Sequence, residues 1–321
     1  MTANEIKRMI CALLLASLPA QGWAPHEHQA MGKVSAAKLA VSTDPDKHEM
    51  VAKLGPLKLP ALTDHMATAQ PKPQFMEIPF DGWITAYHPS LQDEAGNLLP
   101  GRMLHHVAFW NSARSDFLCR NKEEHIFGAG GEMNDWPALP GFGYRVHKGD
   151  RIRVTTMFHN PTDQSYSSAW LVVRMEYQPE SARLKSVYPA WFDVKKCGDS
   201  LFPVPAVGIA LQAEIPVNFS GRLLGVGGHM HDYGEQLVIS DETQKQPIAS
   251  LRATLDEQGH IRSMPVAVFM DRGGFPLQKG DAVLVEARYG KPQVTHAEGM
   301  AIVVGYFLPD DEAEMKGLER K

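Results

Sequence analysis

Residues 150–160, which read DRIRVTTMFHN, decide the fold class. Every second residue of this stretch suits one buried face, and the residues between are mostly polar. Because successive side chains of a strand point to opposite faces, the alternation predicts a β-strand. Pro161 follows the stretch and ends it, since proline cannot donate to a sheet ladder. The predicted inward positions are Ile152, Val154, Thr156 and Phe158.

Similar short runs recur from Gln74 to the end of the chain, separated by Gly, Pro and Asn-Pro turn signals. Such spacing is typical of an all-β protein of the sandwich or jelly-roll type. Helical periodicity is nearly absent. Examples of these runs are FMEIPF, GRMLHHVAFW, AWLVVRMEY, VGIALQAEIPV, EQLVIS, DAVLVEARY and MAIVVGYFL.

The chain of 321 residues is long enough for two domains. Pro, Lys and Gly accumulate over residues 177–204, which suggests a boundary there. We expect β-sandwiches over residues 74–183 and 184–309, a short irregular N-terminal arm over residues 25–73, and a C-terminal tail over residues 310–321. The arm is rich in Ala, Lys, Pro and His and has no sustained period.

The N-terminus has the features of an export signal. Lys7 and Arg8 precede a short apolar run, and small residues follow it. The run is too short for a stable membrane anchor, so residues 1–24 predict a signal peptide and a secreted or periplasmic protein. Cys119 and Cys197 would remain in an oxidising compartment, where one disulfide or two unrelated thiols are both open. The formal charge of -5 gives no basic surface for nucleic acid. A small-molecule substrate is the expected partner, and the oligomeric state stays open.

His229 and His231 form an H-x-H pattern in the second half of the chain. In a strand both imidazoles would project from the same face, as adjacent ligands of one metal ion do. Gly227 and Gly228 leave space beside them. The simpler alternative is two polar residues on one strand face.

Three histidines of the first half and one methionine are further candidates. His105 and His106 are adjacent, so a regular strand would point them apart unless a bulge intervenes or different ring nitrogens reach one ion. His159 ends a strand beside a turn, where ligands often collect. Met300 begins a strand and could be core, but a thioether with two imidazoles would select copper, particularly Cu(I).

The order of four motifs resembles the copper type II, ascorbate-dependent monooxygenases, which include the peptidylglycine and dopamine hydroxylating enzymes. These motifs are LHHVAFW, GFGYRVHKGDRIRVTTMFHN, RLLGVGGHMHDYG and GMAIVVGYF. The resemblance implies two tandem jelly-roll domains with a cleft between them and two copper ions per chain. It implies an electron-transfer copper on His105, His106 and His159. It also implies a dioxygen-binding copper on His229, His231 and Met300.

The same resemblance implies hydroxylation of a C–H bond by dioxygen, with ascorbate or a similar reductant. This chain differs from the amidating members where they hold the substrate carboxylate. Their arginine is replaced by Gly227, and their asparagine and tyrosine by Ile302 and Val304. We therefore expect a small, uncharged substrate. Asp232 could orient a copper ligand or could simply be a turn residue.

Two other functions fit parts of the sequence. His229, His231 and Glu235 have the order of a cupin-like site for a single iron or manganese ion. That arrangement gives no role to the histidines of the first half. The other alternative is an exported copper-binding protein without catalytic activity, built on the same ligands.

Overall fold

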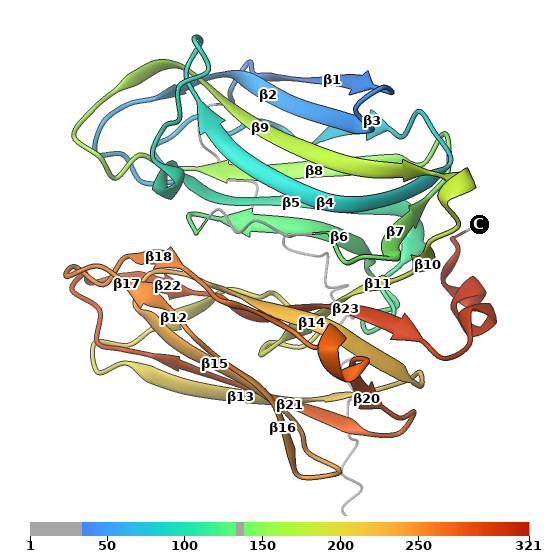
Figure 1. Cartoon of the computed structure of the whole chain (residues 1–321). Helices are drawn as coiled ribbons and strands as arrows, with labels where there is room; N and C mark the ends of the chain where they lie inside the picture. The colour runs from blue at the N-terminus through green and yellow to red at the C-terminus, as the bar shows by residue number, and fades with distance from the viewer. Residues whose placement is uncertain (1–33, 133–137, 321) are drawn as a thin grey trace, which may run out of the picture.

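The computed structural model describes residues 34–132 and 138–320. The expected signal peptide lies outside these residues. In the described part of the chain, regular structure consists of strands and four short 3₁₀ helices, arranged in two bodies (Figure 1). The prediction of an all-β sandwich protein is confirmed, whereas the jelly-roll connectivity stays a prediction.

The first body packs a six-stranded sheet against a four-stranded sheet. Strand β8 is the stretch that predicted the fold, and its inward residues Ile152, Val154 and Phe158 are buried as expected. The six-stranded sheet is formed by β1 (Lys38–Asp44), β2 (Glu49–Leu59), β9 (Tyr166–Pro179), β4 (Gly82–Gln92), β7 (Phe142–Val146) and β10 (Lys185–Ser186). The four-stranded sheet is formed by β3 (Gln74–Glu77), β8 (Arg151–Phe158), β5 (Leu104–Ser115) and β6 (Glu123–Gly130).

The expected irregular arm is wrong for residues 38–59, which form β1 and β2. Strand β2 pairs with both β1 and β9, and it buries Met50, Ala52 and Leu54 in the first core. Its alternation is genuine, but lysines occupy outward positions and Gly55-Pro56 interrupts the register. A composition rich in Lys, Pro and Ala therefore concealed a strand that tertiary packing stabilises.

The second body also packs two main sheets around its own core. One sheet contains β11 (Tyr188–Asp193), β23 (Ala301–Pro309), β14 (Gly221–Met230), β19 (Val266–Val268) and β20 (Phe275–Leu277). The other contains β13 (Ile209–Pro216), β21 (Ala282–Tyr289), β15 (Gly234–Asp241) and β16 (Gln246–Arg252). Two small pairs are β12 (Phe202–Val204) with β22 (Ala297–Gly299) and β17 (Thr254–Leu255) with β18 (Ile261–Ser263). The 3₁₀ helices are η1 (Gly101–Met103), η2 (Glu180–Ala182), η3 (Met270–Arg272) and η4 (Glu312–Leu318).

The two bodies are in direct contact, with β6 of the first lying near β11 and β23 of the second (Figure 1). Val304 and Tyr306 of β23 pack against the core of the first body. The ring of His125 on β6 stacks on Trp191 of β11, with centroids 3.4 Å apart. The face of β23 that carries Val304 and Tyr306 thus extends the core of the first body.

A disulfide joins Cys119, which follows β5, to Cys197, which follows β11. It therefore links the two bodies covalently, and the prediction of one disulfide is confirmed. No helix in residues 34–132 and 138–320 combines the length and apolar character needed to span a membrane.

Candidate metal centre

A β-bulge brings the two adjacent histidines of β5 together. Leu104 pairs with Phe158 and His106 pairs with Met157, so His105 is the extra residue of the bulge. Such an insertion redirects side chains that would otherwise alternate between faces. The Nδ1 atoms of His105 and His106 lie 3.1 Å apart. Of the two ways in which these histidines could reach one ion, the structure provides the bulge.

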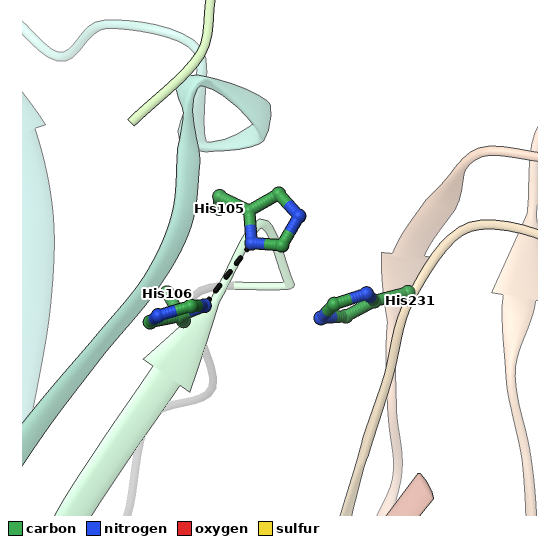
Figure 2. Close-up of side chains that lie close together, drawn as sticks. All are labelled: His105, His106 and His231. Atoms are coloured by element: carbon green, nitrogen blue, oxygen red, sulfur yellow. Dashed lines mark hydrogen bonds between the residues drawn. The ribbon is translucent and has the colours of Figure 1, made fainter. Parts of the chain in front are cut away.

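His231 approaches this pair from the other body, immediately after β14 (Figure 2). Its ring meets that of His105 with centroids 4.5 Å apart. One potential ligand atom from each of His105, His106 and His231 lies within 4.8 Å of the others. Three imidazoles from both halves of the chain are therefore gathered at one point between the bodies.

These imidazoles are held neutral by their surroundings. Burial, helped by neighbouring histidines, lowers the pKa of His106 to about 4. Burial also lowers the pKa of His105 and of His231 well below the usual value, and the closeness of the other histidines adds to the effect. Neutral imidazole is the metal-binding form. The Nε2 atom of His231 is buried and has no hydrogen-bond partner among the described residues, as a metal ligand should be.

His229, the first histidine of the H-x-H pattern, bonds to a carboxylate that the sequence did not indicate. Its Nδ1 atom lies 2.7 Å from Oε1 of Glu132, in the loop after β6. Burial alone would lower the pKa of His229, but the charge and hydrogen bond of Glu132 raise it. The Nε2 atom of His229 is buried without a partner in the described residues. His229 thus presents one bonded nitrogen and one free nitrogen.

Two more histidines flank His105. The ring of His159 lies 5.3 Å from it, and Nε2 of His159 bonds to the carbonyl oxygen of Arg102 at 2.6 Å. The ring of His65 lies 5.2 Å from that of His105. The side-chain amide of Gln70 donates to the carbonyls of both His65 and Phe158, which ties the His65 loop to the end of β8. Sequence reasoning missed His65 because it assigned this region to an irregular arm.

Met300 lies beside His231 through the backbone. The ladder between β14 and β23 pairs Met230 with Ala301, so the next position in that register places Met300 opposite His231. The hydroxyl of Tyr289 accepts the backbone N–H groups of both residues at 3.1 Å. It donates to the carbonyl oxygen of Met300 at 2.5 Å. The sequence did not reveal Tyr289 either. Its hydroxyl links the backbones of two predicted ligands, His231 and Met300, through hydrogen bonds.

The acidic residues singled out after His231 have other roles. Asp232 accepts the backbone N–H of Ile261 at 2.9 Å and is a turn residue, as one of its two interpretations held. Tyr233 follows with a φ of 69°, so a turn separates His231 from β15. Glu235 then pairs with Arg288 at 2.9 Å on the surface. Glu235 is thus engaged in an ion pair, whereas the potential ligand atoms gathered among the described residues belong to His105, His106 and His231.

A cavity of about 350 Å³ lies between the bodies. Its walls include the apolar side chains of Leu98 and Leu99 from the first body and of Ile261 from the second. Arg102 and Glu132 also line it, and each contacts a histidine of the centre. A volume of this size can hold a small organic molecule.

The positions that the resemblance compares with substrate-holding residues lie in the ladder between β14 and β23. Gly227 pairs with Val304, and Ile302 pairs with His229. Val304 packs against the first core, and Ile302 is buried. Val304 therefore contributes to packing between the bodies.

No protein-family model matches the chain. Over 230 residues, it is 27% identical to a "probable copper-dependent oxygenase" of Cochliobolus lunatus, covering 65% of this chain and 71% of that protein. Over 146 residues, it is 27% identical to a "probable copper-dependent oxygenase" of Phoma sp., covering 41% of this chain and 36% of that protein. The chain thus spans about a third of the Phoma relative.

Solved structures with a related outline are much more distant. Peptide:N-glycanase F aligns with a TM-score of 0.42 and 9% identity, covering 82% of this chain and 96% of the glycanase. A chain from the Sulfolobus turreted icosahedral virus aligns with a TM-score of 0.39 and 8% identity, covering 87% of this chain and 95% of the viral one. Likeness at this level carries no functional inference.

Proposed function

We propose that this protein is a copper-dependent oxygenase whose metal centre lies between its two β-sandwiches. The observation that carries the proposal is the convergence of three neutral imidazoles, from His105, His106 and His231, within 4.8 Å. An all-nitrogen donor set of this kind suits copper. The distant likeness to two proteins named as copper-dependent oxygenases supports the same metal and the same class of reaction.

The specific reaction that we propose is hydroxylation of a C–H bond with dioxygen and an external reductant such as ascorbate. Two copper ions per chain would be held by the ligand sets that the resemblance implies. Bound copper would supply the one-electron chemistry and the activation of dioxygen. The first set is His105, His106 and His159, and the second is His229, His231 and Met300.

The chain's own residues would bind the substrate and keep the ligands ready. Leu98, Leu99 and Ile261 give the interbody cavity an apolar wall, which suits a small uncharged molecule. Arg102 and Glu132 line the cavity and form hydrogen bonds with His159 and His229, respectively. Burial keeps the rings of His105, His106 and His231 in the neutral form that binds metal.

The closeness of His231 to His105 and His106 favours a second assignment, in which one ion is shared by the two bodies. A carrier without catalytic activity would also satisfy that geometry. Copper analysis after dialysis separates the assignments: about two ions per chain supports the proposed pair, and one supports the shared site. Iron or manganese in place of copper would overturn the proposal.

The decisive experiment is ascorbate-driven oxygen uptake by the copper-loaded chain and by Met300→Ala. We expect uptake by the unchanged protein and its loss in this variant. Met66→Ala is the control, because Met66 is an exposed methionine in the loop that carries His65. A chain that binds copper and consumes no oxygen would be a carrier. Unchanged uptake in Met300→Ala would remove Met300 from the proposed site.

We also propose that the protein is exported, to the periplasm or outside the cell. The Cys119–Cys197 disulfide supports this location, because such bonds persist in oxidising compartments. Detection of the processed chain outside the cytoplasm would test it, and a chain retaining its N-terminal segment in the cytoplasm would contradict it.

A further inference from the structure

We propose that Glu132 positions His229 for copper binding across the boundary between the two bodies. The inference rests on the proposed copper function and deepens it, because it adds a positioning residue that is not among the ligands. Glu132 belongs to the loop after β6 in the first body, and His229 belongs to β14 in the second. One body therefore orients a ligand that the other body supplies.

The contact between these side chains is short and shielded from solvent. Oε1 of Glu132 lies 2.7 Å from Nδ1 of His229, and the side chains are only 2% and 11% exposed. The backbone N–H of Gly130 donates to the same carboxylate oxygen at 3.1 Å and holds it in place. A charge-assisted hydrogen bond in such surroundings is strong and directional.

This contact selects the nitrogen of His229 that can bind a metal. An ionised carboxylate only accepts hydrogen bonds, so Nδ1 of His229 must carry the proton. In the neutral ring the lone pair then resides on Nε2, which is buried and has no partner among the described residues. A carboxylate on the far side of a ligating imidazole fixes the ring and raises its basicity. The hydrogen bond at Nδ1 and the buried, unpaired Nε2 both indicate that His229 is oriented to bind a metal ion.

Gly130 leaves the space that the contact between Glu132 and His229 needs. A Cβ atom on Gly130 would lie 2.7 Å from Oε2 of Glu132 and 2.7 Å from Cε1 of His229. It would also lie 3.0 Å from the carbonyl oxygen of His105. Only glycine permits this close meeting of three groups, so Gly130→Ala should separate Glu132 from His229 without removing either.

The other histidine of the H-x-H pattern has a different partner. Nδ1 of His231 lies 3.2 Å from the carbonyl oxygen of Glu298, within its own body. Loss of the Glu132 carboxylate should therefore affect His229 and leave the orientation of His231 unchanged. The spectroscopic change should be that of one perturbed imidazole.

The test is a Cu(II) titration of the full chain against a competing chelator, with electron paramagnetic resonance spectra of the loaded forms. For Glu132→Ala we expect an affinity roughly 10- to 100-fold lower and an altered copper hyperfine splitting. Glu132→Gln keeps an acceptor oxygen and should recover part of the affinity. Glu124→Gln is the matched control, because Glu124 is a buried carboxylate on β6 that bonds to Tyr144.

Several outcomes would overturn the inference. If Glu132→Ala lowers the melting temperature of the metal-free chain but keeps the affinity and spectrum, Glu132 has only a structural role. Equal losses in Glu132→Ala and Glu124→Gln would show a general effect of buried carboxylates. Absence of copper binding by the unchanged chain would overturn both the inference and the proposed function. Copper binding that depends on Glu132, without oxygen uptake, would retain the inference and reject the oxygenase.

Discussion

The imidazole rings of His105 and His231 meet edge to face, with centroids 4.5 Å apart, although the two residues belong to different β-sandwiches. The resemblance places them in separate copper sites, yet in this chain they are in contact. The proposed metal centre therefore depends on how the two bodies pack. Changes to the interface should alter metal binding, and changes to the ligands should alter the stability of the interface.

Copper should raise the melting temperature of the unchanged protein, and His231→Ala should lose most of that increase. A ligand that binds only the folded state stabilises it, and the gathered imidazoles exist only when the bodies are packed together. Calorimetry with and without copper measures the increase. His147→Ala is the control, since His147 is exposed beside Asp81. An increase of the same size in His231→Ala would exclude His231 as a ligand.

The metal-free chain should lose stability as the pH falls from 6.5 toward 4. The folded state lowers the pKa of His106 to about 4 from an ordinary 6.5, so the unfolded state binds more protons in this interval. The slope should be about 1.4 kcal/mol per pH unit for each such histidine. Urea denaturation at pH 7, 6 and 5 measures the slope, which His106→Gln should reduce. Equal slopes in the unchanged chain and in His106→Gln would disprove the buried neutral state of His106.

Glu124 should produce the opposite trend. Burial raises its pKa to about 7 from 4.5, although nearby Arg114 acts against the rise. The folded state then binds the extra proton between these values, so this contribution to stability declines as the pH increases from 4.5 to 7. Glu124→Gln should gain roughly 3 kcal/mol relative to the unchanged chain at pH 8 compared with pH 4. Guanidinium denaturation measures the free energy of unfolding of both proteins at both pH values. The same difference between the two proteins at pH 4 and pH 8 would contradict the raised pKa of Glu124.

Tyr289→Phe should destabilise the end of β14 and weaken copper binding. The substitution leaves the backbone N–H groups of His231 and Met300 without their acceptor. Each buried group left unpaired costs about 1–3 kcal/mol. Thermal unfolding and copper titration measure the two effects. Tyr166→Phe should change neither, because the hydroxyl of Tyr166 bonds to Gln164 at the surface. Normal copper affinity in Tyr289→Phe would show that the hydroxyl supports the fold alone.

Removal of the disulfide should lower the free energy of unfolding by roughly 4 kcal/mol, on the loop-entropy estimate. The bridge joins residues separated by 78 positions, so it restricts a long part of the unfolded chain. Denaturation of the variant with both Cys119→Ser and Cys197→Ser measures the loss. A reductant should destabilise the unchanged protein and leave the variant unaffected. An equal response of both proteins would point to another reducible group.

Local patterns predicted much of the framework. The alternation in residues 150–160 correctly identified β8. His229 lies on β14 and His231 immediately after it, and their role as metal ligands stays a prediction. Cys119 and Cys197 form a disulfide, which is one of the two arrangements that the sequence left open. Each of these features depends on short spacing or on residue chemistry, which can be read without knowing the packing.

The missed residues depend on contacts between distant parts of the chain. Glu132 and His229 are separated by 97 positions, and nothing in the loop sequence distinguishes this glutamate from a solvated one. The hydroxyl of Tyr289 meets His231 across 58 positions. His65 reaches the centre only because β2 and its following loop join the first body. Periodicity describes one helix or strand at a time and gives no information on contacts between residues that are distant in sequence.

Because of the bulge at His105, the proposed centre depends on the register between β5 and β8 as well as on the presence of the histidines. Without the extra residue opposite the Phe158–Met157 step, the same two histidines would point to opposite faces of β5. A related chain could therefore keep both histidines and lose the centre through a single deletion upstream in that strand. Among relatives, the pairing register between β5 and β8 should distinguish metal-binding chains from others more reliably than the presence of two adjacent histidines.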